Sequence, residues 1–131
     1  MSHIAEVKTK VTDLEVLKEI LAEMKFEVVE GKGTVTAMDR KTRNVVAKVK
    51  DQEFGIEKVE DTEGNATYNV VGEFYKSGYY GREKEMATAI NKSYGVKKTV
   101  KELSSLGYIV TENQAFTEGK DGSIEFVVSK Y

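Results

Sequence analysis

The residues best suited to bind a ligand lie in a short segment rich in glycine, tyrosine and basic side chains. Its sequence is Ser77-Gly78-Tyr79-Tyr80-Gly81-Arg82, and it leads into the start of a predicted helix. The free N–H groups and the dipole of a helix N-terminus favour an anion, so the flanking cations indicate an anion, nucleotide or peptide site. The candidate ligand-binding residues are Lys76, Tyr79, Tyr80 and Arg82.

This segment matches neither of the common phosphate-binding motifs. Its glycines fall at positions 72, 78 and 81, and no Gly-Lys-Ser/Thr follows them, so it is neither a P-loop nor a dinucleotide-binding fingerprint. The simpler interpretation is a strand-to-helix connection in which glycines make the turns and tyrosines are half-packed as lids. The sequence leaves both interpretations open.

Few residues in the chain have the chemistry for catalysis or metal binding. His3 is the only histidine, no cysteine exists to pair with it, and no GxSxG motif marks a nucleophilic serine. No histidine pair, CxxC or calcium-type acidic spacing predicts a metal site. An alternative cation site consists of the carboxylates near the C-terminal hairpin, Glu112, Glu118, Asp121 and Glu125. We expect no catalytic residues, no cofactor and no enzymatic activity.

Single-stranded nucleic acid is a further ligand class, because basic side chains between tyrosines contact phosphates and stack on bases. The candidates are Tyr75, Lys76, Tyr79, Tyr80 and Arg82, with Arg40, Lys41 and Arg43. The net charge of −2 argues against this class. Charge is nevertheless uneven, since residues 39–50 carry five basic side chains against one acidic, and residues 111–125 carry four acidic against one basic. This asymmetry is typical of solvated surface, with a docking patch as the alternative.

The composition is that of a small soluble domain. A chain of 131 residues is long enough to bury a core, and it contains no cysteine, tryptophan or proline. Charged residues make up 32% of it, no apolar run approaches the ~20 residues that span a bilayer, and the first ten residues lack the apolar centre of a signal peptide. We expect a single domain over residues 1–131, in the cytoplasm and without membrane contact.

The first predicted helix follows an alternating strand at residues 3–11. Thr12 and Glu15 fit a capping box, and Val11 with Val16 fits the accompanying hydrophobic staple. Its apolar stripe consists of Leu14, Leu17, Ile20, Leu21 and Met24.

The second predicted helix spans residues 83–106 and is the longest in the chain. Its core-facing stripe consists of Met86, Ala89, Ile90, Ser93, Val96, Val100 and Leu103. Gly95 interrupts the pattern and indicates a kink or a point of close packing, and Gly107 ends the helix as a left-handed cap.

Short alternating runs separated by turn residues occupy most of the remaining chain. Strands are predicted around residues 26–28, 34–37, 45–49, 54–56 and 68–74, and a last hairpin joins residues 108–116 to 123–129. Short loops between such runs are typical of antiparallel sheets. The sequence therefore predicts an α+β fold: an antiparallel sheet of about seven or eight strands with two helices packed on one face. A helix end followed by an aromatic residue recurs at residues 21–26 and 103–108, which favours two helix-then-hairpin units.

Several short motifs along the chain resemble those of a known family. They are Met1-Ser2-His3-Ile4, Val7-Lys8-Thr9, Asp13-Leu14, Ile90-Asn91-Lys92-Ser93-Tyr94, Leu106-Gly107-Tyr108 and Asp121-Gly122-Ser123-Ile124. Together they resemble an uncharacterised family of plastid and cyanobacterial conserved hypothetical reading frames, a domain of unknown function. The resemblance implies a small soluble accessory protein, sometimes encoded near an AAA-type ATPase, and it supplies no catalytic residues. We therefore expect a non-enzymatic adaptor that acts through protein–protein interaction.

Overall fold

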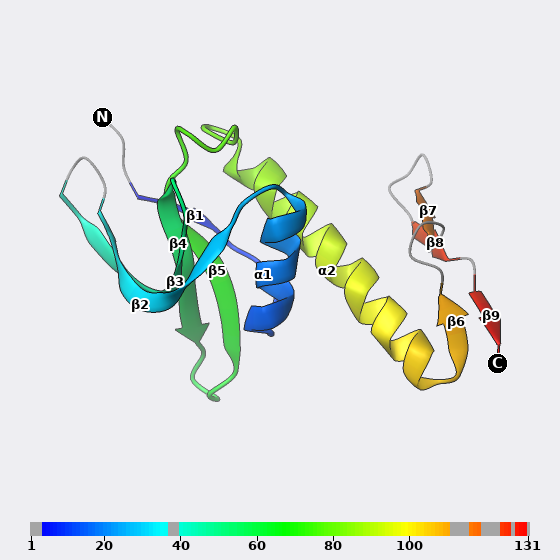
Figure 1. Cartoon of the computed structure of the whole chain (residues 1–131). Helices are drawn as coiled ribbons and strands as arrows, with labels where there is room; N and C mark the ends of the chain where they lie inside the picture. Colours follow the sequence, from blue (N-terminus) through cyan, green and yellow to red (C-terminus); the bar gives the residue numbers. More distant parts are fainter. Residues whose placement is uncertain (1–3, 37–39, 111–115, 119–123, 127, 131) are drawn as a thin grey trace. The chain divides into compact units, whose positions relative to one another are not determined.

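The computed structural model describes residues 4–36, 40–110, 116–118, 124–126 and 128–130 (Figure 1). The protein has an α+β fold with an antiparallel sheet and two helices, as the sequence predicts. Its contacts divide the chain into two compact units, residues 1–94 and residues 95–131. Each unit is described by itself below.

The first unit begins with a short strand and a capped helix. Strand β1 (Ala5–Val7) precedes helix α1 (Leu14–Glu23). The expected capping residue is wrong by one position: Asp13, not Thr12, accepts hydrogen bonds from the backbone N–H groups of Glu15 and Val16, at 2.9 and 3.4 Å. The Thr12 hydroxyl instead lies 3.0 Å from the hydroxyl of Tyr94. An aspartate cap also places a negative charge at the positive end of the helix dipole.

Strand β1 is shorter than the run of alternating residues that predicts it. Beyond Val7 the chain still follows the neighbouring strand, but the contacts change. The Asn69 side chain accepts from the Thr9 N–H at 3.1 Å, and the Val11 carbonyl accepts from the Tyr68 N–H at 3.0 Å. A side chain replaces one backbone partner, so regular strand pairing ends.

Four further strands complete a five-stranded antiparallel sheet. They are β2 (Val28–Thr36), β3 (Thr42–Val49), β4 (Glu53–Glu60) and β5 (Ala66–Glu73), and the spatial order is β1-β5-β4-β3-β2. The register between β2 and β3 shifts between Glu30 and Gly33, which is a β-bulge. Bulges bend a strand and increase its twist, and Figure 1 shows β2 bending along its length.

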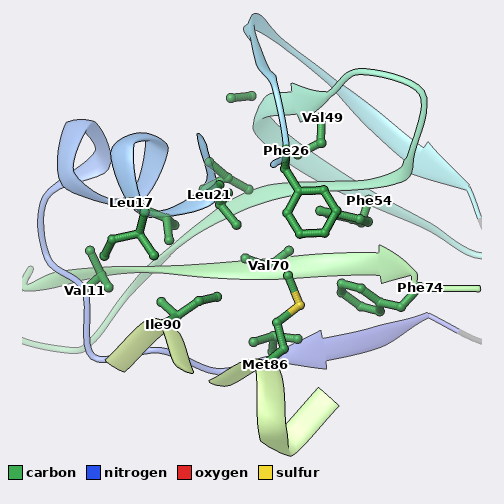
Figure 2. Packing of buried hydrophobic residues seen from close by; sticks show 14 residues of the cluster. Val11, Leu17, Leu21, Phe26, Val49, Phe54, Val70, Phe74, Met86 and Ile90 are labelled. Carbon is green, nitrogen blue, oxygen red and sulfur yellow. The ribbon is translucent and has the colours of Figure 1, made fainter. Parts of the chain in front are cut away.

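The main core joins both helices to the sheet. Figure 2 shows Leu17 and Leu21 of α1 near Val70 of β5, with Met86 and Ile90 of helix α2 (Glu83–Ser105) on the same cluster. All five side chains are buried.

Three phenylalanines extend this core toward the end of the sheet. The ring of Phe54 meets Phe26 edge-on at 5.3 Å and stacks on Phe74 at 4.9 Å. Aromatic pairs in these geometries stabilise a core beyond the area that they bury.

A second, smaller cluster consists of Val35, Val45 and Val71. Val71 follows Val70 in β5, and successive side chains of a strand point to opposite faces, so this cluster lies on the other face of the sheet. The curled hairpin of β2 and β3 packs closely there because Gly55 has no side chain; a Cβ on it would lie 3.1 Å from Val45 Cγ1 and 2.6 Å from the Ala47 carbonyl.

The second unit contains the end of α2 and four three-residue strands: β6 (Tyr108–Val110), β7 (Phe116–Glu118), β8 (Ile124–Phe126) and β9 (Val128–Lys130). Strand β6 pairs with β9, and β7 with β8, both antiparallel. The nine described strands thus form sheets of five, two and two, whereas we expected one sheet of seven or eight. The backbone partners of these last four strands lie within their own unit.

Helix α2 ends near Gly107 as expected, but its stripe is not a single core surface. Met86 and Ile90 are its buried residues, whereas Val96, Val100 and Leu103 belong to the second unit and are only half-buried. Nothing lies within 4 Å of a Cβ placed on Gly95, so close packing does not explain this glycine.

Candidate functional site

The segment between β5 and α2 is a hydrogen-bonded loop. The hydroxyl of Ser77 donates to the Phe74 carbonyl at 2.6 Å and accepts from the Tyr79 N–H at 3.0 Å. Gly78 and Gly81 have φ angles of 86° and 73°, a region that glycine enters without the penalty that a side chain brings. The Arg82 N–H closes the loop on the Tyr79 carbonyl at 2.7 Å. The turns are therefore fixed by the sequence of the loop itself.

The tyrosines of this loop have different environments. Tyr79 is half-buried and packs against the main core, which agrees with its interpretation as a lid. Tyr80 and Tyr75 are 63% and 48% exposed. The loop is anchored through one ring and presents two others to solvent.

Both cations of the loop already have carboxylate partners. Lys76 Nζ lies 3.6 Å from a carboxylate oxygen of Glu53, and the ammonium sits 5.5 Å from the ring centre of Tyr75. Arg82 donates from Nε and Nη2 to one oxygen of Glu85, at 2.8 and 2.5 Å. These hydrogen bonds to Glu85, and then its negative charge, raise the pKa of Arg82 above its usual value.

The start of α2 is also supplied with negative charge. Glu83 and Glu85 occupy its first turn, and the Glu83 carboxylate accepts from the Gly81 N–H at 3.3 Å. Two carboxylates thus place negative charge at the end of the helix that otherwise favours an anion, which opposes the binding of a phosphate or nucleotide there. The rings of Tyr75 and Tyr80 are exposed.

The other basic candidates do not gather around this loop. Arg40 and Lys41 are exposed in the connection between β2 and β3. Arg43 is held by two carboxylates: it donates to Glu57 from Nε and Nη2 at 2.7 and 2.6 Å, and Nη2 lies 2.7 Å from a carboxylate oxygen of Glu6. Hydrogen bonds to Glu57, and then to Glu6, raise the pKa of Arg43 above its usual value.

A second concave surface lies away from the loop, where β2, β3 and β4 meet. This groove has a volume of about 540 Å³. Its lining includes the half-buried Val46 and the buried Val45, and its polar members include Lys32, Asn44 and Lys58. The groove joins no residue of the Lys76–Arg82 loop.

Comparison of the chain with protein-family models, with curated protein sequences and with solved structures finds no match. The family resemblance noted in the sequence, and the accessory role that it implies, stay predictions.

The described residues hold no cluster of three histidine, cysteine or acidic side chains suited to a metal ion. His3 and the side chains of Glu112, Glu118, Asp121 and Glu125 lie outside the part that the structure describes. Neither of the two helices has a stretch apolar and long enough to cross a membrane, as far as the described residues extend.

Sequence reasoning did not find the groove or the ion cluster of Arg43. The sequence predicts separate strands around residues 26–28 and 34–37 with a turn at 31–33, and this is wrong: β2 runs through these residues, with the bulge between Glu30 and Gly33. No sequence signal pairs Arg43 with Glu6, because strands β1 and β3 are separated in the sheet by β4 and β5.

Proposed function

We propose that this protein is a non-enzymatic adaptor that binds another protein through Tyr75 and Tyr80. The single observation that carries the proposal is the exposure of these two rings, 48% and 63%, on a loop whose two cations already have carboxylate partners. Tyrosine is enriched in protein interfaces because it contributes a large contact area with few rotatable bonds. A preformed loop loses little conformational entropy on binding, which favours a protein partner.

The partner class and the cellular location are proposed from sequence motifs and composition, not from the structure of the loop. An AAA-type ATPase is the partner class that the family resemblance implies, and we propose that the complex forms in the cytoplasm. The absence of a catalytic residue set in the sequence supports an accessory role.

Site-specific crosslinking tests this proposal. A photoreactive amino acid replaces Tyr80 in one sample and Val29 in another; Val29, 46% exposed on β2, is the matched apolar control. We expect the photoreactive residue at position 80 to crosslink a defined protein. The crosslink should be lost when Tyr75→Ser is added, and position 29 should not give it. Equal capture from both positions, or capture that Tyr75→Ser leaves unchanged, contradicts the proposal.

Two alternative functions share the same loop, and one assay separates them. These are a small-ligand module for an anion or nucleotide, through Lys76, Tyr79, Tyr80 and Arg82, and single-stranded nucleic-acid binding. A ligand that binds the native state raises its thermal midpoint. A midpoint raised by phosphate or ATP, and lost in Arg82→Gln, supports the first alternative. A salt-sensitive shift with oligonucleotides supports the second.

A further inference from the structure

Strand β4 has an incompletely paired edge. It pairs with β5 along its whole length, from Glu53 to Glu60, but with β3 only at Gly55 and Ile56. Both strands are described throughout, so the remaining positions of β4 have no ladder partner on the side facing β3. Among the described residues, the backbone groups that point away from β5 between Lys58 and Glu60 have no ladder partner in β3.

The groove lies beside this edge. Lys58 belongs both to the unpaired part of β4 and to the groove wall, and Lys32 lines the same groove from the bulge of β2. The volume of about 540 Å³ falls within the range of ~300–1,000 Å³ typical of ligand sites. Two valines, two lysines and a strand edge thus meet in one place.

The outer edge of β2 is a poorer site for strand addition. Its bulge between Glu30 and Gly33 interrupts a regular ladder, and Lys32 stands beside it. Bulges and lysines are devices by which proteins prevent pairing at a sheet edge. The β4 edge carries no bulge in its register with β5.

We propose that an extended acidic peptide segment of a partner protein binds this groove by adding a strand to β4 at Lys58–Glu60. The strand edge supplies backbone hydrogen bonds, and the carboxylates of the peptide pair with Lys32 and Lys58. The existing contact of Lys58 Nζ with Glu60, at 3.3 Å between side chains 44% and 57% exposed, is exchanged at little cost because exposed ion pairs are weak. The residues lining the groove include no aromatic ring, so nucleic-acid bases have nothing to stack on. This inference goes beyond the proposed function, because it concerns a surface separate from Tyr75 and Tyr80.

Synthetic peptides test the proposal without the natural partner. The probe is a fluorescein-labelled octapeptide of alternating glutamate and valine, and its lysine–valine counterpart is the control. Fluorescence anisotropy with the full chain should show binding of the acidic peptide alone, weakened by salt. N-methylation of alternate peptide bonds should abolish it, because strand addition needs backbone N–H donors.

Charge reversals locate the site. Lys58→Glu and Lys32→Glu should each weaken binding by at least about fivefold, because an attraction becomes a repulsion. Lys84→Glu, an exposed lysine on α2, makes the same change in net charge and should leave affinity unchanged. Amide resonances of Lys58 to Glu60 should shift on titration.

Three results overturn the proposal: no binding of the acidic peptide, equal binding of both peptides, or equal weakening by Lys84→Glu. Peptide binding that survives Tyr75→Ser, while the crosslink from position 80 is lost, separates this groove from the tyrosine surface. If crosslinking fails but the peptide binds, the tyrosine surface is refuted and the groove is retained.

Discussion

Replacing Arg43 with methionine should destabilise the protein, because this side chain connects β3 to β4 beyond their two ladder pairs and also reaches β1. Arg43 of β3 makes two hydrogen bonds to Glu57 of β4, where those strands have no ladder pair, and it reaches Glu6 of β1. Strands β1 and β3 are not neighbours in the sheet, so this contact spans the two strands between them. Methionine keeps the apolar stem and removes the charge.

The magnitude follows from exposure. The side chains of Arg43 and Glu57 are 35% and 14% exposed, and that of Glu6 is 33% exposed. Charged hydrogen bonds contribute about 1.5–3 kcal/mol when shielded and exposed ion pairs about 0.2–1 kcal/mol. We therefore expect Arg43→Met to lower the free energy of unfolding by about 2 kcal/mol, which corresponds to a midpoint lower by about 8 °C.

Urea denaturation with a double-mutant cycle measures this effect. The cycle of Arg43→Met with Glu57→Gln should give a coupling of about 1–1.5 kcal/mol, and the cycle with Glu6→Gln about 0.5 kcal/mol. The pair Lys50–Glu27 is the control, since it is separated by 3.8 Å with side chains 58% and 71% exposed, and its coupling should be near zero.

The pH dependence has a defined sign. Because the folded-state pKa of Arg43 is raised, its contribution is complete below the unfolded pKa and is lost only as pH rises through the folded value, above the range in which proteins are studied. If the coupling energy between Arg43 and Glu57 is as small as that between Lys50 and Glu27, Arg43 does not connect the strands.

Three other perturbations have defined outcomes. Gly72→Ala should destabilise by at least about 2 kcal/mol in urea denaturation, because φ is 141° and a Cβ would lie 2.3 Å from the Glu53 carbonyl; Gly78→Ala, with open space around it, should cost only about 1 kcal/mol, and equal losses would contradict this. Ile90→Ala should cost about 2–5 kcal/mol because Ile90 is fully buried, and an unchanged urea midpoint would show that α2 is not part of the core. Hydrogen bonds from the backbone of Asn65 chiefly lower the pKa of Asp61. The contribution of Asp61 to folding stability is therefore complete above the unfolded pKa and is lost as pH falls through the folded value. Asp61→Asn should make stability less dependent on pH below about pH 4, and an ordinary pKa of Asp61 in an NMR titration would contradict this.

Local sequence patterns predicted where helices and strands lie better than which strands pair with each other. The stripe containing Leu17, Ile20 and Leu21 identifies α1 because burial on one face requires that spacing, and all three are buried. The sequence predicted Thr12 as the N-cap, whereas the cap is Asp13, because both side chains suit that position. The Thr12 hydroxyl instead contacts Tyr94, which is far along the chain.

Pairing and site chemistry depend on contacts that are distant in sequence. The C-terminal segment was predicted as one hairpin, and its described strands pair in the nested antiparallel order of a hairpin, Tyr108 with Lys130 and Phe116 with Phe126. The sequence did not predict that these strands form sheets of their own, because periodicity fixes which face a residue occupies and not which strand it meets. In the loop, the sequence identified Arg82 as a cation. Whether the Arg82 guanidinium is free to bind a ligand depends on Glu85, in the first turn of the helix, which accepts two of its hydrogen bonds.

The position of β1 has a consequence for synthesis of the chain. Ala5 pairs with Gly72, and the backbone N–H of Lys10 donates at 2.8 Å to Asn91 of α2. A ribosome adds about 5–20 residues per second, so the first strand waits roughly 4–17 seconds after it emerges before both partners exist. The meander from β2 to β5 pairs neighbours in sequence and can form within that interval. The apolar face of α1 stays without its α2 partner meanwhile, so the nascent N-terminal segment exposes apolar surface until residue 91 has left the exit tunnel.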